Sequence, residues 1–302
     1  MKVIIVGLGV QGEKRLKIAK KDVVATVDPY KENSNYKNIY DVPLDIYDSA
    51  ILCIQDDLKI EFIDYLLNNN KNVMVEKPLF SKKEIDLKRI KKLVNKKKVS
   101  FYTAYNHRFE PHFIKMKEVL DSQELGSIYS VRLFYGNGTA RLVRDSKWRD
   151  TGAGVLPDLG SHILDTLEFW FEKKLSNFQV FSATKNENKA FDNVIFGIKK
   201  KPSIIIETSL LSWRNHFFAD IYGENGSAHI SSLCKWGPTK FTLRKRVLPS
   251  GKPTEVSNEI ISFDPTWDAE YKYFKKLILE KRTNIDNDIW INVTLNGLIK
   301  KL

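Results

Sequence analysis

The sequence predicts an α/β protein in which a doubly wound parallel sheet is followed by an α+β domain with a mainly antiparallel, open sheet. Three observations lead to this prediction. The first hundred residues alternate short apolar runs with longer amphipathic stretches, as β-α units do. After about residue 125, most runs are alternating, β-branched or aromatic, which is typical of antiparallel strands. A glycine-rich turn directly follows the first apolar run.

The composition indicates folded cores and excludes a disordered or disulfide-bonded chain. Of the 302 residues, 42% are hydrophobic and 12% aromatic, which allows enough burial to offset the conformational entropy of the chain. The two cysteines, Cys53 and Cys234, indicate reduced thiols. The apolar runs are too short for a membrane span, and the first residues do not form a signal peptide. We therefore expect a cytoplasmic protein with two domains, 1–122 and 123–302.

The first predicted domain alternates five strands with three helices. Right-handed crossovers place such helices on both faces of a parallel sheet. The predicted strands are Lys2–Val6, Val23–Val27, Ala50–Ile54, Asn72–Val75 and Val99–Ala104, and the predicted helices lie near Gln11–Lys20, Leu58–Asn69 and Lys82–Lys96.

The second predicted domain combines two helices with a series of strands. One helix is expected near residues 157–171, and a last helix from Thr266 to Lys281. The predicted strands are Ile128–Tyr135, Phe178–Ala183, Val194–Lys199, Ile204–Leu211, Ala219–Tyr222, Ser227–Ile230 and Lys240–Val247.

The net charge of +12 is the unusual figure in the composition. The segment Ser81–Lys98 alone has nine basic and two acidic residues, and its apolar residues fall on one helical stripe. We interpret it as a surface helix with a solvated basic face. A nucleic-acid or anionic-membrane patch is the alternative, but no aromatic residue is present there to stack on a base. We expect neither nucleic acid nor a membrane as a partner.

The glycine-rich turn spans residues 7–12, and its sequence Gly-Leu-Gly-Val-Gln-Gly has the spacing G-x-G-x-x-G. Glycines at these positions allow a tight turn, close approach of a pyrophosphate and close packing of helix on strand. The second strand is followed by Asp28, which is suited to accept hydrogen bonds from an adenosine ribose. We predict a dinucleotide site for NAD. NADP remains an alternative cofactor because Lys31 lies close to Asp28 in the sequence. Its predicted residues are Gly7, Gly9, Val10, Gln11, Gly12 and Asp28.

A lysine follows the fourth predicted strand in the sequence Glu76-Lys77-Pro78. Ligands of open α/β sheets bind at the carboxyl ends of the strands, and a lysine beside a nicotinamide can hydrogen-bond a substrate hydroxyl or carbonyl. The proline makes the chain locally rigid, with a cis peptide as one form. A surface lysine in a turn is the alternative.

A second group of polar residues lies on the helix near 157–171. Asp158, His162 and Asp165 are spaced i, i+4 and i+7, so they share one helix face. A histidine one turn from a carboxylate suits acid–base chemistry near neutral pH. A structural histidine remains the alternative, and two ligands without a third close in sequence do not indicate a metal, so we expect none.

The segment 136–148 has no clear strand or helix period and carries several cations. A long polar loop in a folded domain is often functional. The cations Arg141, Arg144, Lys147 and Arg149 are candidates to hold a phosphate or carboxylate, and solvated charges paired with Asp145 and Asp150 are the alternative.

Together these motifs resemble the Gfo/Idh/MocA family, the glucose-fructose oxidoreductase and inositol dehydrogenase group. The resemblance spans nearly the whole chain. It is carried by the glycine turn, Glu76-Lys77-Pro78, the run Ala-Tyr-Asn-His-Arg-Phe at 104–109, Lys147-Trp148-Arg149, and residues 154–165. It implies a Rossmann domain and an open antiparallel sheet that builds homo-oligomers, dimers or tetramers.

The resemblance also implies NAD(P)-dependent hydride transfer on sugars, cyclitols or nucleotide-linked sugars. Lys77 and His162 would then be the acid–base residues, Asp158 would contact the substrate, and Asn106 and Arg149 would line the pocket. Many members have a Thr-Pro pair near the cofactor, whereas this chain has Ile54-Gln55-Asp56-Asp57. Gln55 is therefore the expected substitute for that pair in cofactor contacts, together with Glu76, Lys77 and Pro78. An NAD-dependent glycoside hydrolase and a non-catalytic sugar or dinucleotide sensor remain alternatives.

Overall fold

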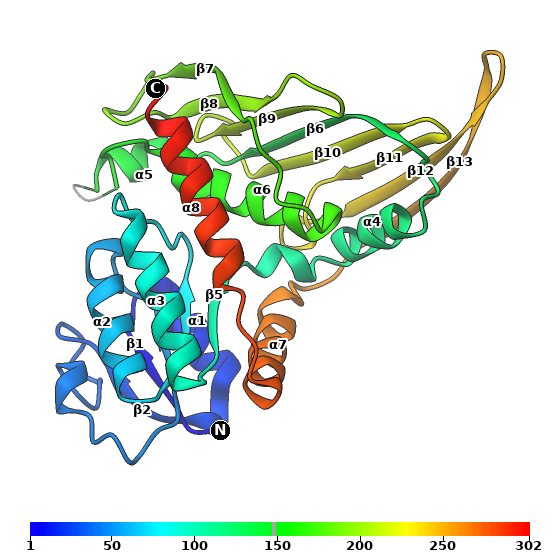
Figure 1. The fold of residues 1–302 in the computed structure, drawn as a ribbon. Coiled ribbons are helices and arrows are strands. Elements are labelled where there is room, and N and C mark those ends of the chain that lie inside the picture. The colour runs from blue at the N-terminus through cyan, green and yellow to red at the C-terminus, as the bar shows by residue number, and fades with distance from the viewer. Residues whose placement is uncertain (147–148) are drawn as a thin grey trace. The chain divides into compact units, whose positions relative to one another are not determined.

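The computed structural model describes residues 1–146 and 149–302, which form two compact units (Figure 1). The first unit contains Met1–Asn106 and Thr266–Val293, and the second contains His107–Pro265 and Thr294–Leu302. The predicted domain limits, 1–122 and 123–302, stay a prediction. Within the described residues, no helix is long and apolar enough to cross a membrane.

The first unit is built on a five-stranded, fully parallel sheet with the strand order β2-β1-β3-β4-β5. This confirms the parallel α/β prediction, including the order of strands and helices along the chain. The strands are β1 (Val3–Val6), β2 (Val23–Val27), β3 (Ser49–Leu52), β4 (Asn72–Glu76) and β5 (Phe101–Ala104), and the helices are α1 (Val10–Ala19), α2 (Asp56–Asn68), α3 (Glu84–Lys97) and α7 (Thr266–Glu280).

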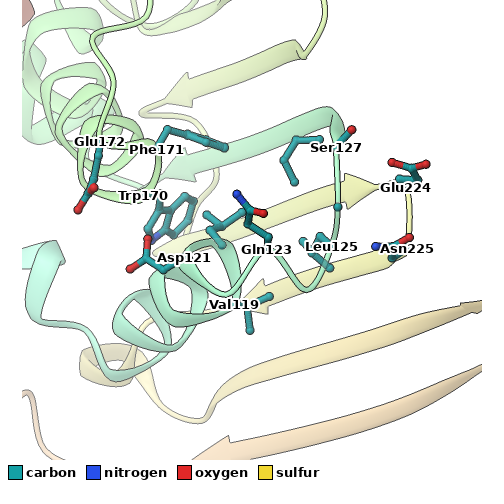
Figure 2. Close-up of a pocket in the computed structure, with 13 residues that line it drawn as sticks. Val119, Asp121, Gln123, Leu125, Ser127, Trp170, Phe171, Glu172, Glu224 and Asn225 are labelled. Carbon is teal, nitrogen blue, oxygen red and sulfur yellow. The ribbon is translucent and has the colours of Figure 1, made fainter.

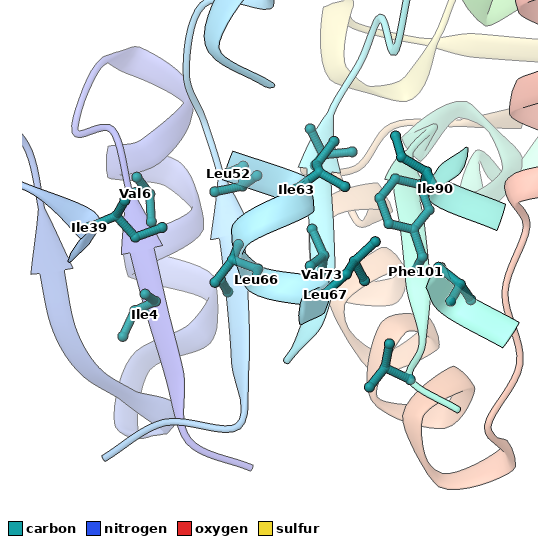
Figure 3. Packing of buried hydrophobic residues seen from close by; sticks show 14 of the residues in the cluster. Ile4, Val6, Ile39, Leu52, Ile63, Leu66, Leu67, Val73, Ile90 and Phe101 are labelled. Carbon is teal, nitrogen blue, oxygen red and sulfur yellow. The ribbon is translucent and has the colours of Figure 1, made fainter. Parts of the chain in front are cut away.

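Two apolar cores cover the two faces of this sheet. Because successive strand residues point to opposite faces, Ile4 and Val6 pack with side chains of α2 and α3 (Figure 3). Val3 and Ile5 pack on the other face, in the cluster that contains Phe274 of α7. Helix α7, which follows the second sheet in the sequence, therefore completes the core of the first unit.

The second unit contains an eight-stranded sheet with the order β13-β12-β11-β10-β6-β9-β8-β7. All neighbouring pairs are antiparallel except β6 with β9, so the mainly antiparallel prediction is confirmed. The strands are β6 (Ile128–Gly136), β7 (Gln179–Thr184), β8 (Asn193–Ile198), β9 (Ser203–Ser209), β10 (His216–Gly223), β11 (Gly226–Ser231), β12 (Thr239–Val247) and β13 (Gly251–Ile260).

Helices α4 (Pro111–Asp121) and α6 (Val155–Phe171) pack against this sheet. Alternate strand residues such as Leu133 and Ile206 are buried, whereas Ile205 and Tyr222 are exposed. One face of the sheet is therefore open, as predicted. Helix α8 (Ile285–Ile299) has residues in both units.

Candidate functional site

The glycine-rich turn has the geometry that its spacing predicts. A Cβ on Gly7 would lie 2.4 Å from the backbone oxygen of Cys53, and a Cβ on Gly12 would lie 1.8 Å from that of Gly7, so larger residues do not fit at either position. A Cβ on Gly9 would meet no atom within 4 Å. The space beside Gly9 suits the close approach of a pyrophosphate to the start of α1, where Val10 and Gln11 begin the helix.

Asp28 connects the glycine turn to the segment after β2. Its Oδ2 accepts a hydrogen bond from the backbone N–H of Leu8 (2.7 Å), and its Oδ1 accepts from those of Tyr30 (2.8 Å) and Lys31 (3.0 Å). Burial disfavours the charged form, but these three donors outweigh it and hold the pKa of Asp28 below its usual value. The carboxylate is thus an ionised acceptor at the end of β2, as a ribose site requires.

Gln55 and Lys77 occupy the carboxyl ends of the neighbouring strands β3 and β4. Gln55 is the N-cap residue of α2, with extended backbone geometry and no capping bond from its own side chain. Lys77 directly follows β4, and the Lys77–Pro78 peptide is cis. Both residues therefore lie at the carboxyl ends of the parallel strands, the same end of the sheet at which the glycine turn follows β1.

Glu76 belongs to a buried ionic cluster that the sequence did not reveal. Its Oε1 accepts from Arg15 Nε at 2.6 Å, and Arg15 Nη1 also lies 2.7 Å from Glu270 Oε2. The ring of Trp267 lies against the guanidinium at 4.2 Å. The two carboxylates outweigh the burial of Arg15 and raise its pKa, so it stays charged. Glu76 was predicted to bind the cofactor, and in this structure one of its oxygens is held by Arg15.

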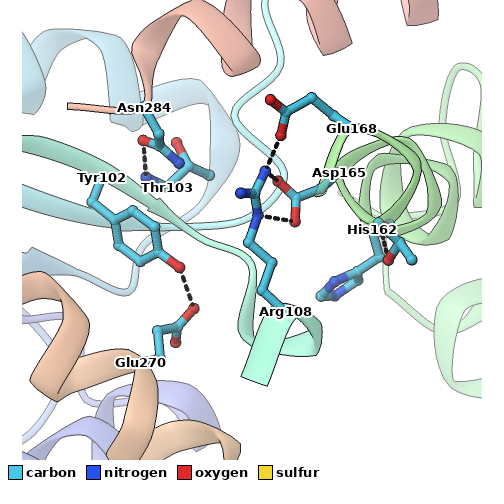
Figure 4. A network of polar contacts seen from close by, with 9 residues as sticks. Tyr102, Thr103, Arg108, His162, Asp165, Glu168, Glu270 and Asn284 are labelled. Atoms are coloured by element: carbon cyan, nitrogen blue, oxygen red, sulfur yellow. Dashed lines mark hydrogen bonds and ion pairs between the residues drawn. The ribbon is translucent and has the colours of Figure 1, made fainter. Parts of the chain in front are cut away.

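Glu270 contributes the second carboxylate of this cluster from α7. The hydroxyl of Tyr102 donates to its Oε1 at 3.2 Å (Figure 4). Burial is the largest cause of its pKa shift, Arg15 opposes it, and the charge of Glu76 adds to it, so that the pKa rises to about 7. The predicted substrate residue Asn106 lies in the same unit, where its Nδ2 donates to Thr266 Oγ1 at 2.8 Å.

In the second unit, α6 carries Asp158, His162 and Asp165 as predicted, and begins at Val155, two residues before the expected start. Its first residue is fixed because the N–H of Val155 donates to the carbonyl of Phe191 at 2.9 Å. Gly154, just before the helix, has a φ of +54° and no room for a Cβ beside Phe191.

Asp165 lies in an ion-pair network that sequence reasoning did not predict. Arg108 holds it with two parallel hydrogen bonds, of 2.8 Å from Nε and 2.7 Å from Nη2, and also reaches Glu168 at 2.5 Å (Figure 4). This is the fork geometry of a strong arginine–carboxylate pair. The network fixes the helix face one turn after His162.

His162 is 5% exposed, and its ring stacks on that of His107 at a centroid distance of 4.1 Å and an angle of 16°. Tyr135 of β6 meets both rings edge-on, at 5.1 Å from His107 and 5.9 Å from His162. His107 was not among the predicted site residues, and its position in the motif at 104–109 was the only available signal.

The predicted polar loop is partly helical, which corrects the sequence interpretation. A short helix, α5 (Ala140–Arg144), forms there, with Ala140 and Val143 buried. Arg149 Nη2 lies 3.6 Å from Asp158 Oδ2, whereas the predicted partner Asp150 accepts instead from the N–H groups of Lys189 and Ala190. Lys147 and Trp148 lie outside the described residues.

A cavity of about 600 Å³ opens in the second unit between the ends of α4 and α6 (Figure 2). Its charged lining residues are Asp121, Glu172 and Glu224. Among the described residues that line it, none is a predicted site residue. We therefore do not assign the predicted chemistry to this cavity.

Comparison with known proteins extends these observations. Residues 1–105 match the family model described as an oxidoreductase family with an NAD-binding Rossmann fold, and residues 113–229 match that of the GFO/IDH/MocA C-terminal domain. Inositol 2-dehydrogenase of Rhizobium meliloti is 24% identical over 125 residues, which cover 40% of this chain and 36% of the relative. Glucose-6-phosphate 3-dehydrogenase of Bacillus subtilis is 28% identical over 112 residues, covering 35% and 31%.

The matched segments thus span only about a third of these curated relatives. Solved structures match over the whole chain. A putative NADPH-dependent oxidoreductase from Desulfitobacterium hafniense has a TM-score of 0.86 at 16% identity, covering 100% of this chain and 95% of that one. Levoglucosan dehydrogenase in complex with NADH has a TM-score of 0.82 at 16% identity, covering 100% and 96%. The chain belongs to the GFO/IDH/MocA family, and its N-terminal region is an NAD-binding Rossmann domain.

Proposed function

We propose that this protein is an NAD(P)-dependent oxidoreductase that transfers a hydride between nicotinamide and a hydroxyl or ketone carbon of a sugar or sugar-like polyol. The observation that carries the proposal is the position of Lys77, which lies at the same edge of one parallel sheet as the glycine turn. A cofactor held by that turn extends along the strand ends. The names of the curated relatives, an inositol and a glucose-phosphate dehydrogenase, support a polyol substrate.

The residues of the turn fit a dinucleotide. Gly9 leaves its surroundings open where a pyrophosphate needs close approach, and ionised Asp28 offers acceptors for ribose hydroxyls. Gln55, Lys77 and Pro78 would contact the cofactor farther along the sheet edge. When bound, NAD(P) accepts or supplies the hydride. A carboxylate at Asp28 favours NAD, because it repels a 2′-phosphate.

Residues of the chain would transfer the proton of the substrate hydroxyl group and orient the substrate. In oxidation, an imidazole nitrogen of His162 would accept the hydroxyl proton, and Lys77 Nζ would donate a hydrogen bond to the same oxygen. In reduction the proton would move the opposite way. Asp158, one turn before His162 and 3.6 Å from Arg149, would hold substrate hydroxyl groups with that arginine and Asn106.

A nucleotide-linked sugar is the finer form of the substrate proposal. Arg141 and Arg144 are exposed residues of α5, and with Arg149 they supply cations that suit a diphosphate. Assembly into dimers or tetramers through the open sheet face, and a cytoplasmic location, stay predictions.

The test uses purified protein with NAD⁺ or NADP⁺ and a panel of myo-inositol, scyllo-inositol, glucose 6-phosphate, levoglucosan and a uridine diphosphate sugar, read at the absorbance of reduced nicotinamide. Lys77→Met and His162→Ala should lose most turnover and still bind NADH. Wild-type turnover in both variants would refute the assigned roles. Release of an aglycone without net reduction of the cofactor would support the glycoside hydrolase alternative instead.

A further inference from the structure

Lys59 of α2 is a buried lysine whose three donors are all used. Its side chain is 3% exposed, and its Nζ lies 2.7 Å from Asp56 Oδ1. Nζ also donates to the backbone oxygens of Glu76 and Pro78, each at 2.7 Å. An ammonium group has three N–H donors. The ammonium therefore joins the start of α2 to the chain that leaves β4.

The two carbonyls that Lys59 binds lie on either side of Lys77. Glu76 is the last residue of β4, so the main chain loses the support of the sheet at Lys77. Lys59 replaces this support on both sides of Lys77, and Arg15 holds the side chain of Glu76 at 2.6 Å. Two buried cations thus fix the residues next to Lys77.

Burial of the charged Lys59 ammonium group costs free energy, because the group loses its contact with water. Burial is the largest influence on Lys59 and lowers its pKa, while Asp56 acts in the opposite direction. A methionine of similar length would fill the same volume without desolvating an ammonium group. The position is therefore better explained by the two carbonyl contacts than by packing.

We propose that Lys59 is a positioning residue, which fixes the main chain on both sides of Lys77 and so sets the direction in which the Lys77 amine is presented. This inference rests on the proposed acid–base role of Lys77. It concerns a residue that does not itself touch the reacting atoms.

Hydrogen–deuterium exchange tests the geometric part of the inference without turnover. In Lys59→Met, amide exchange in the segment that contains Lys77, Leu79 and Phe80 should rise by roughly tenfold or more, because the segment opens more often once no ammonium group binds the Glu76 and Pro78 carbonyls. The control Lys88→Met removes an exposed lysine of α3 and should leave this exchange unchanged. Equal exchange in Lys59→Met and wild type would overturn the proposal. If Lys59→Met does not fold, Lys59→Gln replaces it in both experiments.

A double-mutant cycle with Lys77→Met tests the functional part. The probe is myo-inositol, or glucose 6-phosphate if the wild type oxidises it faster. We expect Lys59→Met to lower kcat by roughly 10- to 100-fold, as misplacement of a reacting group does, with little change in the KM for the substrate. Lys59→Arg should recover part of the loss. In the Lys77→Met background, Lys59→Met should cause no further loss.

The outcomes separate this inference from the proposed function. Independent, multiplying losses in the cycle would show a general structural role and refute positioning. Normal turnover in Lys77→Met would refute the proposed role of Lys77. Inactivity of the wild type toward the whole panel would count against the proposed function, and the exchange experiment would still decide whether Lys59 holds this segment.

Discussion

The carboxyl of Glu270 should make the stability of the first unit fall as the pH rises through the neutral range. Its pKa is raised from 4.5 to about 7 in the folded protein, first by burial and then by the charge of Glu76, against the opposing effect of Arg15. At a pH between these two pKa values, Glu270 keeps its proton in the folded state and has released it in the unfolded state. The resulting stabilisation is fully present below pH 4.5 and is lost as the pH approaches and passes 7.

The size of the effect follows from the difference between the two pKa values. From pH 5 to pH 8 the contribution of Glu270 to the free energy of unfolding should fall by about 2 to 3 kcal/mol. Glu270→Gln has no proton to lose and should lack this part of the pH dependence. The stability of wild type relative to Glu270→Gln should therefore decrease by that amount over this range.

Urea unfolding followed by tryptophan fluorescence measures this difference, because Trp267 lies directly on Arg15 in the cluster. Asp268→Asn, which removes an exposed carboxylate from the same helix, is the control and should leave the pH dependence of stability unchanged. A wild-type minus Glu270→Gln difference that is constant from pH 5 to pH 8 would refute the reasoning.

Three further predictions concern the glycine turn with Asp28 in the first unit and the histidine stack in the second. Asp28→Ala leaves three backbone donors without their acceptor, so the free energy of unfolding in urea titrations should fall by about 1–3 kcal/mol. NADH should also bind this variant more weakly in fluorescence titrations. Unchanged stability and affinity would contradict the role of Asp28. Gly12→Ala should be overpacked and destabilised by about 1–3 kcal/mol, whereas Gly9→Ala should fold normally and lose NADH affinity; the reverse pattern would exclude the proposed turn geometry. His107→Ala should lower kcat by roughly 10- to 100-fold through a misplaced His162, and His107→Phe, which keeps a ring for stacking, should lose much less; equal losses would argue against the stack.

Most of the fold was predictable because its strands carry strong periodic signals. The buried parallel strands are short, continuous apolar runs, and β6 and β9 alternate between buried and exposed residues. Strand β13 (Gly251–Ile260) was missed because nearly all its residues are exposed, so it has no apolar face to reveal it. Its register depends on pairing with β12, which a local pattern does not contain. Helices α4 and α8 were also missed.

The candidate site was predictable where neighbours in sequence are neighbours in space. The glycine turn and the helix face with Asp158 and His162 are local features, and both form as expected. The surroundings of these residues come from distant segments. Arg15 meets Glu270 across most of the chain length, and His107 stacks on His162. Such contacts arise from topology, so no spacing rule identifies them.

The assignment of α7 to the first unit has a consequence for synthesis on the ribosome. The helix begins at Thr266, and its Tyr271, Phe274 and Leu277 belong to the core on one face of the parallel sheet. Until this late segment emerges from the exit tunnel, the nascent cofactor domain has an uncovered apolar sheet face, and Arg15 lacks the Glu270 carboxylate. The second sheet is translated in this interval, so the first unit is completed only after the second sheet has been made.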